Sequence, residues 1–202
     1  MRALSLATVS ALLTVAATAA EPASVADALA RGKVSVNARL RYEGVDQTGL
    51  RDADALTLRT RLGYTTASLQ GWKAMLEAEN ITAADGDSYS QAGITAGGAG
   101  RAVVADPEST EINQAWLAFE SGQTQATLGR QRLVLDNARF IGDVAWRQNQ
   151  QTFDALVLQN KSLAKTTLTY AYLHQINRVF SDRHPQGDWE SASHVVNAAY
   201  SG

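Results

Sequence analysis

The chain has 202 residues, of which 45% are hydrophobic and 19% are charged, a balance typical of folded proteins. Its net charge of -2 provides no bulk attraction to nucleic acid, so we expect no nucleic-acid partner. The chain contains no cysteine, which excludes the small disulfide-rich scaffolds of exported proteins.

The first twenty residues have the pattern of a secretory signal peptide. A positively charged start, an alanine-rich apolar run and several small residues precede the polar Glu21. We therefore expect residues 1–20 to be removed on export and residues 21–32 to form a periplasmic N-terminal segment; a buried helix is the alternative. No later segment reaches the ~18 apolar residues of a spanning helix, so a membrane-spanning structure here would be a β-barrel.

From Lys33 onward, apolar and polar residues alternate with the two-residue period of a β-strand. The expected strands cover residues 33–43, 56–65, 72–79, 112–119, 125–133, 152–159, 166–177 and 194–200. Long and short connections follow one another in turn, as in an up-and-down transmembrane barrel with tight periplasmic turns and long external loops. Trp72, Phe119 and Tyr200 lie beside short turns, where an interfacial aromatic girdle is expected. A soluble β-sandwich is the alternative, but it does not require this asymmetry.

We therefore predict an all-β fold, an antiparallel up-and-down transmembrane β-barrel built from residues 33–202. Eight strands alone would enclose an interior filled with side chains. The chain also ends on Tyr200, Ser201 and Gly202, which resembles a strand end entering a turn. We expect these strands to be the N-terminal part of a larger barrel.

The connection at residues 133–151 is long for a chain of closely spaced β-strands. Connections of this length are usually functional or disordered. It carries Arg139, Phe140, Trp146 and Arg147, a composition that argues against disorder. We expect this loop to fold inward and constrict the pore.

Charged residues occupy the polar face of the first three strands. A first hairpin symmetric about Leu50 would pair Arg41 with Arg59. The same register would pair Arg39 with Arg61, and the next strand would bring two glutamates beside these arginines. Columns of charge select solutes in pores, whereas a charge facing lipid costs ~2 to 4 kcal/mol at the midplane. The predicted pore-lining residues are Arg39, Arg41, Arg59, Arg61, Glu77, Glu79, Arg130, Arg139 and Arg147. The alternative is an internal salt-bridge network that stabilises the wall without acting on solutes.

A barrel enzyme acting on envelope lipids would have to use His174, His184 or His194. Ser193 and His194 are adjacent on a strand and point to opposite faces, so they do not form a catalytic pair. No spacing of histidines and carboxylates indicates a metal site, and no glycine motif for phosphate is present. We therefore expect neither an enzyme nor a cofactor.

Five segments carry a recognisable pattern: RYEGVD at 41–46, ALTLRTRLGY at 55–64, EINQAWL at 111–117, GRQ at 129–131, and NARFIG followed by WRQN within 137–149. Together they resemble the outer-membrane alginate export family of porin-like barrels. Members are large barrels, and the name-giving one passes an anionic polysaccharide through an arginine-lined lumen. The resemblance implies that the arginines predicted above, those of residues 39, 41, 59, 61, 130, 139 and 147, line the pore. Many relatives are general or unassigned porins, so alginate itself does not follow.

The sequence thus predicts a porin-like channel in the outer membrane of a Gram-negative bacterium, for diffusion or export of small hydrophilic or anionic solutes. Its expected partners are outer-membrane lipid and the solute. A small closed barrel with a structural or adhesion role is the first alternative, and the lipid-acting enzyme is the second.

Overall fold

The computed structural model describes residues 8–11 and 21–202. The predicted signal peptide lies outside the described residues except for a short strand, β1 (Thr8–Ala11), so its cleavage stays a prediction. The remaining elements are α1 (Val25–Ala30), β2 (Lys33–Val45), β3 (Ala53–Thr65), β4 (Trp72–Ala83), β5 (Ser109–Ser121), β6 (Thr124–Gln131), β7 (Thr152–Asn160), β8 (Thr166–Asn177) and β9 (Asp188–Tyr200).

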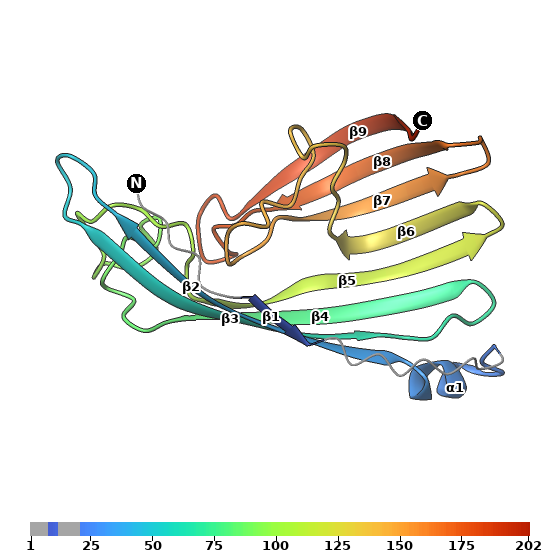
Figure 1. The fold of residues 1–202 in the computed structure, drawn as a ribbon, viewed down its shortest axis with the longest axis horizontal. Helices are drawn as coiled ribbons and strands as arrows, with labels where there is room; N and C mark the ends of the chain where they lie inside the picture. The colour runs from blue at the N-terminus through green and yellow to red at the C-terminus, as the bar shows by residue number, and fades with distance from the viewer. Residues whose placement is uncertain (1–7, 12–20) are drawn as a thin grey trace.

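All the strands form one antiparallel sheet in chain order, from β1 to β9. This confirms the predicted all-β, up-and-down fold. The long connections lie at one end of the sheet, and the short turns lie at the other end with α1 (Figure 1). Among the described strands, β9 pairs only with β8, so the sheet is curved but not closed.

Several strands extend beyond their predicted ends. β2 continues to Val45, β3 already begins at Ala53, and β9 begins at Asp188 rather than at residue 194. Backbone pairing persists through polar residues after the apolar alternation has ended, and the sequence pattern does not register it. β6 is the exception: it ends at Gln131, because the chain turns inward before Leu133.

The predicted register of the first hairpin is wrong by two residues. Arg39, not Arg41, lies opposite Arg59, and Arg41 lies opposite Thr57. The hairpin is centred near Gly49, whose φ of 86° places the turn one residue earlier than a hairpin centred on Leu50. A shift of two residues keeps every side chain on its predicted face. The second hairpin has the expected register, with Arg61 opposite Glu79.

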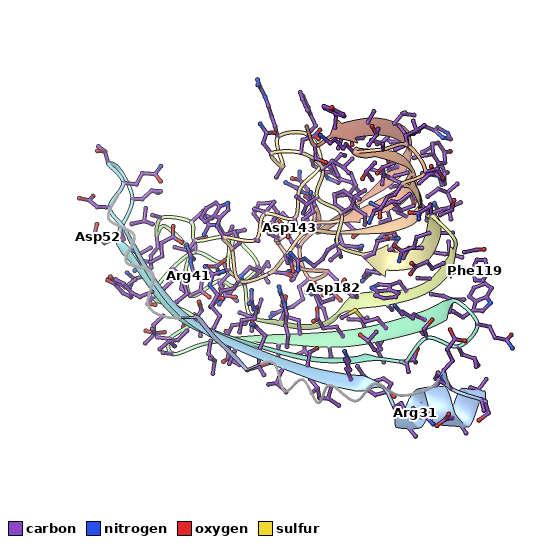
Figure 2. All side chains as sticks on the ribbon, turned by 45° about the vertical axis from the view of Figure 1, so that its right-hand side comes forward. Arg31, Arg41, Asp52, Phe119, Asp143 and Asp182 are labelled. Atoms are coloured by element: carbon purple, nitrogen blue, oxygen red, sulfur yellow. The ribbon has the colours of Figure 1, made fainter. Side chains whose placement is uncertain are left out.

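The two faces of the sheet have the opposite polarity to those of a soluble protein. On β3, Leu62 is 58% exposed on the outer face, whereas its neighbour Arg61 is 8% exposed on the hollow face. Figure 2 shows Arg41 and Asp143 inside the curve of the sheet and Phe119 at its outer side. A sandwich would bury the leucines instead, so this polarity fits a wall between lipid and an aqueous interior.

Two long connections cover the hollow face and bury small apolar clusters there. The loop of residues 84–108 places Tyr89, Ala102 and Val104 against the loop ends of β2 and β3. The loop of residues 132–151, called the central loop below, places Leu133 against Phe153 and the inner faces of β7 and β8. Folded loops therefore cover the hollow face over β2 and β3 and again over β7 and β8.

The short-turn end carries α1 and an aromatic pair. Ser24 caps the helix by accepting a hydrogen bond from the Asp27 amide at 3.2 Å, and the Ala67 amide in the β3–β4 turn donates to the Ala28 carbonyl at 3.0 Å. The rings of Trp72 and Phe119 lie 4.7 Å apart at the outer rim. No helix among the described residues has the length and apolar character needed to cross a membrane.

Candidate functional site: the arginine wall and the central loop

The arginine wall consists of Arg39 and Arg41 on β2 and Arg59 and Arg61 on β3. Strand alternation places all four on the hollow face, and the register sets Arg39 directly beside Arg59. Like charges in directly opposed positions destabilise a sheet, so this arrangement requires partners from elsewhere.

Carboxylates compensate two of these arginines. Arg61 forms a buried ion pair with Glu79 across β3 and β4. Arg41 lies between Glu43, at 2.7 Å, and Asp106, with which it forms a second buried ion pair. Removing one partner of such a pair lowers the stability of the protein by several kcal/mol, because the other charge stays buried without a partner.

Asp106 connects the wall to two loops. It ends the loop of residues 84–108, is fully buried, and accepts a hydrogen bond from the Gln148 amide at 2.8 Å. The Arg147 guanidinium lies 3.8 Å from the same carboxylate and 2.9 Å from Glu43. Burial raises the pKa of the Asp106 carboxyl, and the neighbouring Arg41 opposes this rise. Asp106 therefore ties the central loop to β2.

The other two wall arginines bind backbone rather than carboxylates. Arg39 donates to the carbonyls of three successive central-loop residues, 145–147, at 3.0, 2.9 and 3.1 Å. Arg59 and Arg61 donate to the Gln148 carbonyl at 3.2 and 3.4 Å. The guanidinium groups thus hold the central loop against the wall.

Gln148 is the most deeply inserted residue of the central loop. Its side-chain amide donates to the Arg39 carbonyl at 3.2 Å and to the backbone and hydroxyl oxygens of Thr57 at 3.0 and 2.9 Å. Its Oε1 atom and the Arg59 Nε atom are buried and have no partner within the described structure. Buried polar atoms without partners are uncommon in folded proteins, so an ordered water or a bound ion is expected beside these two atoms.

The other side of the central loop is fixed by its own ion pair. Arg132 donates to Asp143 at 2.6 Å, and Gln150 donates to the same carboxylate at 2.5 Å. Burial alone would raise the pKa of Asp143, but the hydrogen bonds from Arg132 and Gln150 hold it below its ordinary value. Together with Leu133 in the β7–β8 cluster, these contacts make the loop a bridge from β7 and β8 to β2 and β3.

The predicted site residues do not all come together. Arg147 joins the wall, but Arg139 is exposed on the loop, 5.6 Å from the centre of the Phe140 ring. Glu77 lies on the hollow face, where it accepts hydrogen bonds from Asn113 at 2.6 Å and Gln114 at 3.0 Å.

Arg130 lies apart from the arginine wall. Its backbone is paired with Ala115 on β5, and its guanidinium binds Asp154 on β7 at 2.8 and 3.0 Å. Its role as a pore residue stays a prediction.

Three residues that hold this site together escaped the sequence analysis: Glu43, Asp106 and Gln148. Asp106 precedes a proline and has the signature of a turn, so its burial has no signal in the sequence. Glu43 continues the predicted polar face of β2, two residues beyond Arg41, which is the one available clue.

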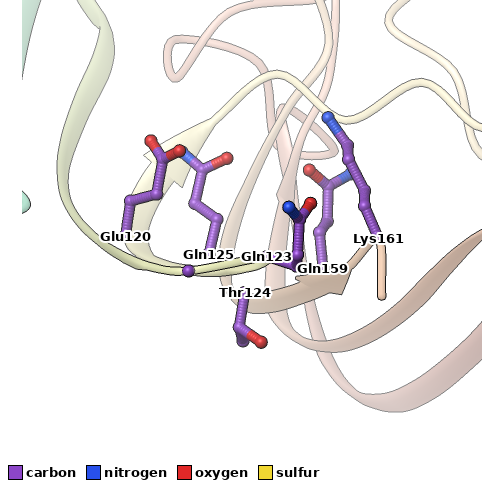
Figure 3. A pocket seen from close by; sticks show the side chains of 7 residues that line it. Glu120, Gln123, Thr124, Gln125, Gln159 and Lys161 are labelled. Atoms are coloured by element: carbon purple, nitrogen blue, oxygen red, sulfur yellow. The ribbon is translucent and has the colours of Figure 1, made fainter. Parts of the chain in front are cut away.

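Among the hollows beside the central loop and the short turns, two differ most in size. A cavity of about 410 Å³ lies against the central loop and is lined by Arg139, Phe140 and Trp146 among others. A polar depression at the β5–β6 turn, between Glu120, Gln159 and Lys161, has only about 60 Å³ (Figure 3). The latter holds a few water molecules at most, so the first is the better candidate for a solute.

Two of the three histidines, His184 and His194, make hydrogen bonds within the structure. The His194 Nδ1 atom lies 2.8 Å from the Tyr170 hydroxyl, and the His184 Nδ1 atom accepts a hydrogen bond from the Gln186 amide at 2.9 Å. Within residues 21–202, no group of three or more histidines and carboxylates is placed to hold a metal ion.

A single antiparallel sheet with an apolar outer face and a hollow face rich in charged side chains defines the wall of a porin-like β-barrel. Residues 26–172 match the family model described as alginate export, and the chain belongs to this family. The crystal structure of Pseudomonas aeruginosa OccD3 (OpdP) is similar to this chain with a TM-score of 0.52 and 16% sequence identity, over 79% of this chain and 31% of that one. The chain thus spans about a third of the length of that protein. No curated protein sequence matches it.

Proposed function

We propose that this protein forms a channel in the outer membrane of a Gram-negative bacterium, through which small hydrophilic or anionic solutes diffuse. The observation that carries this proposal is the bridge made by the central loop across the hollow, charged face of an outwardly apolar sheet. A loop in this position narrows the aqueous interior and brings fixed charge close to any passing solute.

The charges on the hollow face support a preference for anions. Arg41, Arg61 and Arg147 have carboxylate partners, whereas no ion pair of Arg39, Arg59 or Arg139 is found within the described residues. Glu77 also lacks an ion pair, but it is hydrogen-bonded to Asn113 and Gln114, whereas Arg39 and Arg59 lie against the central loop. Their positive charge beside the loop would lower the barrier for an anion, and several weak contacts would let it leave again. An anionic polysaccharide such as alginate is the finer candidate, which rests on the family description alone.

Reversal potentials of the full-length natural protein in planar lipid bilayers test this function. Arg39→Gln removes an uncompensated charge from the hollow face, and we expect selectivity to shift toward cations. Arg31→Gln is the control, because it removes one arginine charge at the end of α1, away from the arginine wall (Figure 2). Absence of any conductance from correctly folded protein would falsify the channel, and equal reversal potentials for wild type and Arg39→Gln would refute the role of the wall.

The constricting role of the central loop has a separate test. Excision of residues 136–150 removes the bridge, Gln148 included, but keeps Leu133 against Phe153 on β7. We expect single-channel conductance to rise. Equal or lower conductance in a folded barrel contradicts a constriction at this loop.

The alternatives have less support. A small closed barrel would need the described strands to meet at their edges, and they form an open sheet. A lipid-acting enzyme would need a nucleophile beside a histidine, whereas the contacts of His184 and His194 are with a backbone amide and a tyrosine.

A further inference from the structure

A groove at the short-turn end takes no part in the contacts of the hollow face. It is lined by α1, by the β3–β4 turn, by residues 72–74 of β4 and by Leu117 of β5, and its volume is about 260 Å³. We call it the rim groove. All of its lining side chains are apolar except those of Thr66 and Lys73. An apolar recess of this kind is unusual beside water and needs an occupant or a surrounding lipid.

The sequence of α1 gives the rim groove one apolar side. Val25, Ala28 and Leu29 line it, and their spacing places them on the same side of the helix. Asp27 lies on the other side of the helix, where it is paired with Arg31 at 2.6 Å. Of the three apolar residues only Ala28 is buried, whereas Val25 is 67% exposed and Leu29 is 51% exposed. The helix therefore turns apolar surface toward the groove that no protein atoms cover.

Two hydrogen bonds hold α1 outside the sheet. The Ala67 amide donates to the Ala28 carbonyl at 3.0 Å, and the Tyr64 hydroxyl donates to the Leu29 carbonyl. Figures 1 and 2 show the helix at the short-turn end, outside the curve of the sheet. The rim groove therefore opens on the outer face, which meets lipid in a transmembrane barrel.

The strands supply the other side of the rim groove. Ala74 lies opposite Leu117, and Trp72 lies opposite Phe119 with the ring centres 4.7 Å apart. Ala74 has only a methyl side chain, so it fills little of the space beside its larger neighbours. Aromatic residues of barrels gather where the acyl chains meet the headgroups. We therefore place the rim groove at this level of the membrane.

Lys73 is the one charged residue among those that line the rim groove. No ion pair of Lys73 is found within residues 21–202. Strand alternation starts its side chain on the opposite face from Trp72, but a lysine stem is long and flexible enough to bring the ammonium group to the rim. A lysine ammonium binds phosphate as a point charge. An apolar recess with one cation at its border suits an acyl chain that ends in a phosphate headgroup.

We propose that the rim groove binds a phospholipid of the periplasmic leaflet, with one acyl chain between α1 and β4 and the phosphate paired with the Lys73 ammonium group. The lipid would cover the apolar side of α1 that the strands leave exposed. The inference rests on the membrane placement in the proposed function, but it does not require the protein to conduct.

Native mass spectrometry of the full-length natural protein, released from detergent, tests the rim groove. The probe is dipalmitoylphosphatidylglycerol, and dipalmitoylglycerol provides the same two chains without a phosphate. We expect one phospholipid per protein to bind about fivefold more tightly than dipalmitoylglycerol, the factor that one lysine contributes at an anionic membrane surface.

Two variants and two controls assign the binding to the rim groove. Ala74→Phe places a ring in the groove, and we expect binding to weaken about tenfold, as the loss of about two buried methylene groups predicts. Ala78→Phe is the matched control, because Ala78 is exposed on the same face of β4 and does not line the groove. Lys73→Gln should weaken phospholipid binding about fivefold and leave dipalmitoylglycerol binding unchanged. Lys161→Gln, at another short turn, is its control.

The results separate the lipid site from the channel. Phospholipid binding that is weakened in Ala74→Phe and Lys73→Gln but kept in both controls supports the site, whether or not the protein conducts. Equal binding by the wild type and Ala74→Phe overturns it, even in a conducting channel. Wild-type oligomers that carry no lipid and that Ala74→Phe separates into single copies place a second copy of the chain in the groove, and this result also overturns the proposal.

Discussion

Asp106 provides the sharpest test of how the central loop is held. Asp106→Ala removes one ion pair with Arg41, a longer contact with Arg147 at 3.8 Å, and the acceptor of the Gln148 amide. The central loop thereby loses both of its contacts with this carboxylate, those of Arg147 and of the Gln148 amide. We expect the central loop to leave the wall more often while the strands stay folded.

The size of the effect follows from the contacts that remain. Leaving one member of a buried ion pair without its partner costs about 3–5 kcal/mol, but Arg41 keeps Glu43 at 2.7 Å. We therefore expect about 2–3 kcal/mol, which corresponds to a rise of roughly 30- to 150-fold in the undocked population. The arginine contacts to residues 145–148 remain, so docking is weakened rather than abolished.

Thiol labelling measures this population directly, because the chain has no cysteine of its own. Asn149→Cys places one thiol in a position that is 3% exposed, and the Asn149 Nδ2 atom has no hydrogen-bond partner within the described structure that the change would remove. The labelling rate with a charged thiol reagent should rise by the factor above in Asp106→Ala and stay constant in the exposed control Asp52→Ala. A rise of less than about threefold in folded Asp106→Ala refutes Asp106 as the link between the loops.

Three further outcomes follow from the packing of the wall. Arg61→Met should destabilise the protein by about 3–5 kcal/mol in urea unfolding from lipid vesicles, and adding Glu79→Leu should restore most of this loss; no restoration would contradict a simple buried pair. Gly129→Ala should cost about 1–3 kcal/mol in the same assay, because its φ is 120° and an added Cβ meets a backbone oxygen of β5; an unchanged midpoint argues against the conformation described. Asp143 should titrate below the ordinary value of ~3.9 in carbon NMR, and its contribution to stability should be complete above that value and disappear as the pH falls through the lowered pKa; titration at or above the ordinary value would exclude the Arg132 pair.

The fold could be predicted from the sequence because each strand has a two-residue alternation that only one face assignment satisfies. A register error of two residues at the first hairpin left all the faces correct, so Arg39 and Arg59 were placed on the proper side in spite of it. Ends of strands were less well predicted, since backbone pairing beyond the apolar residues depends on the neighbouring strand. β9, which begins six residues before its predicted start, is the clearest case.

The contacts of the central loop could not be predicted, because they depend on where two loops meet in space. Nothing near Asp106 in the sequence points to Gln148, which is 42 positions away. The inner apolar face of β7 had a partial signal: Ala155 and Val157 alternate with Leu156 and Leu158, so both faces of this part of the strand are apolar. A strand that is apolar on both faces needs cover on both, and here the central loop covers the hollow face.

The partners of the wall arginines are far away along the chain, and this has a consequence for assembly. Arg41 and Asp106 are 65 positions apart, and Arg39 and the Arg147 carbonyl are 108 apart. Contacts of such long range form late, because a large loop must close before they contribute. During insertion into a membrane, the first hairpin therefore carries adjacent uncompensated arginines until β7 has joined the sheet. The first strands alone therefore stabilise a partly inserted chain only weakly. We expect the sheet to be completed as a unit rather than through a series of stable intermediates.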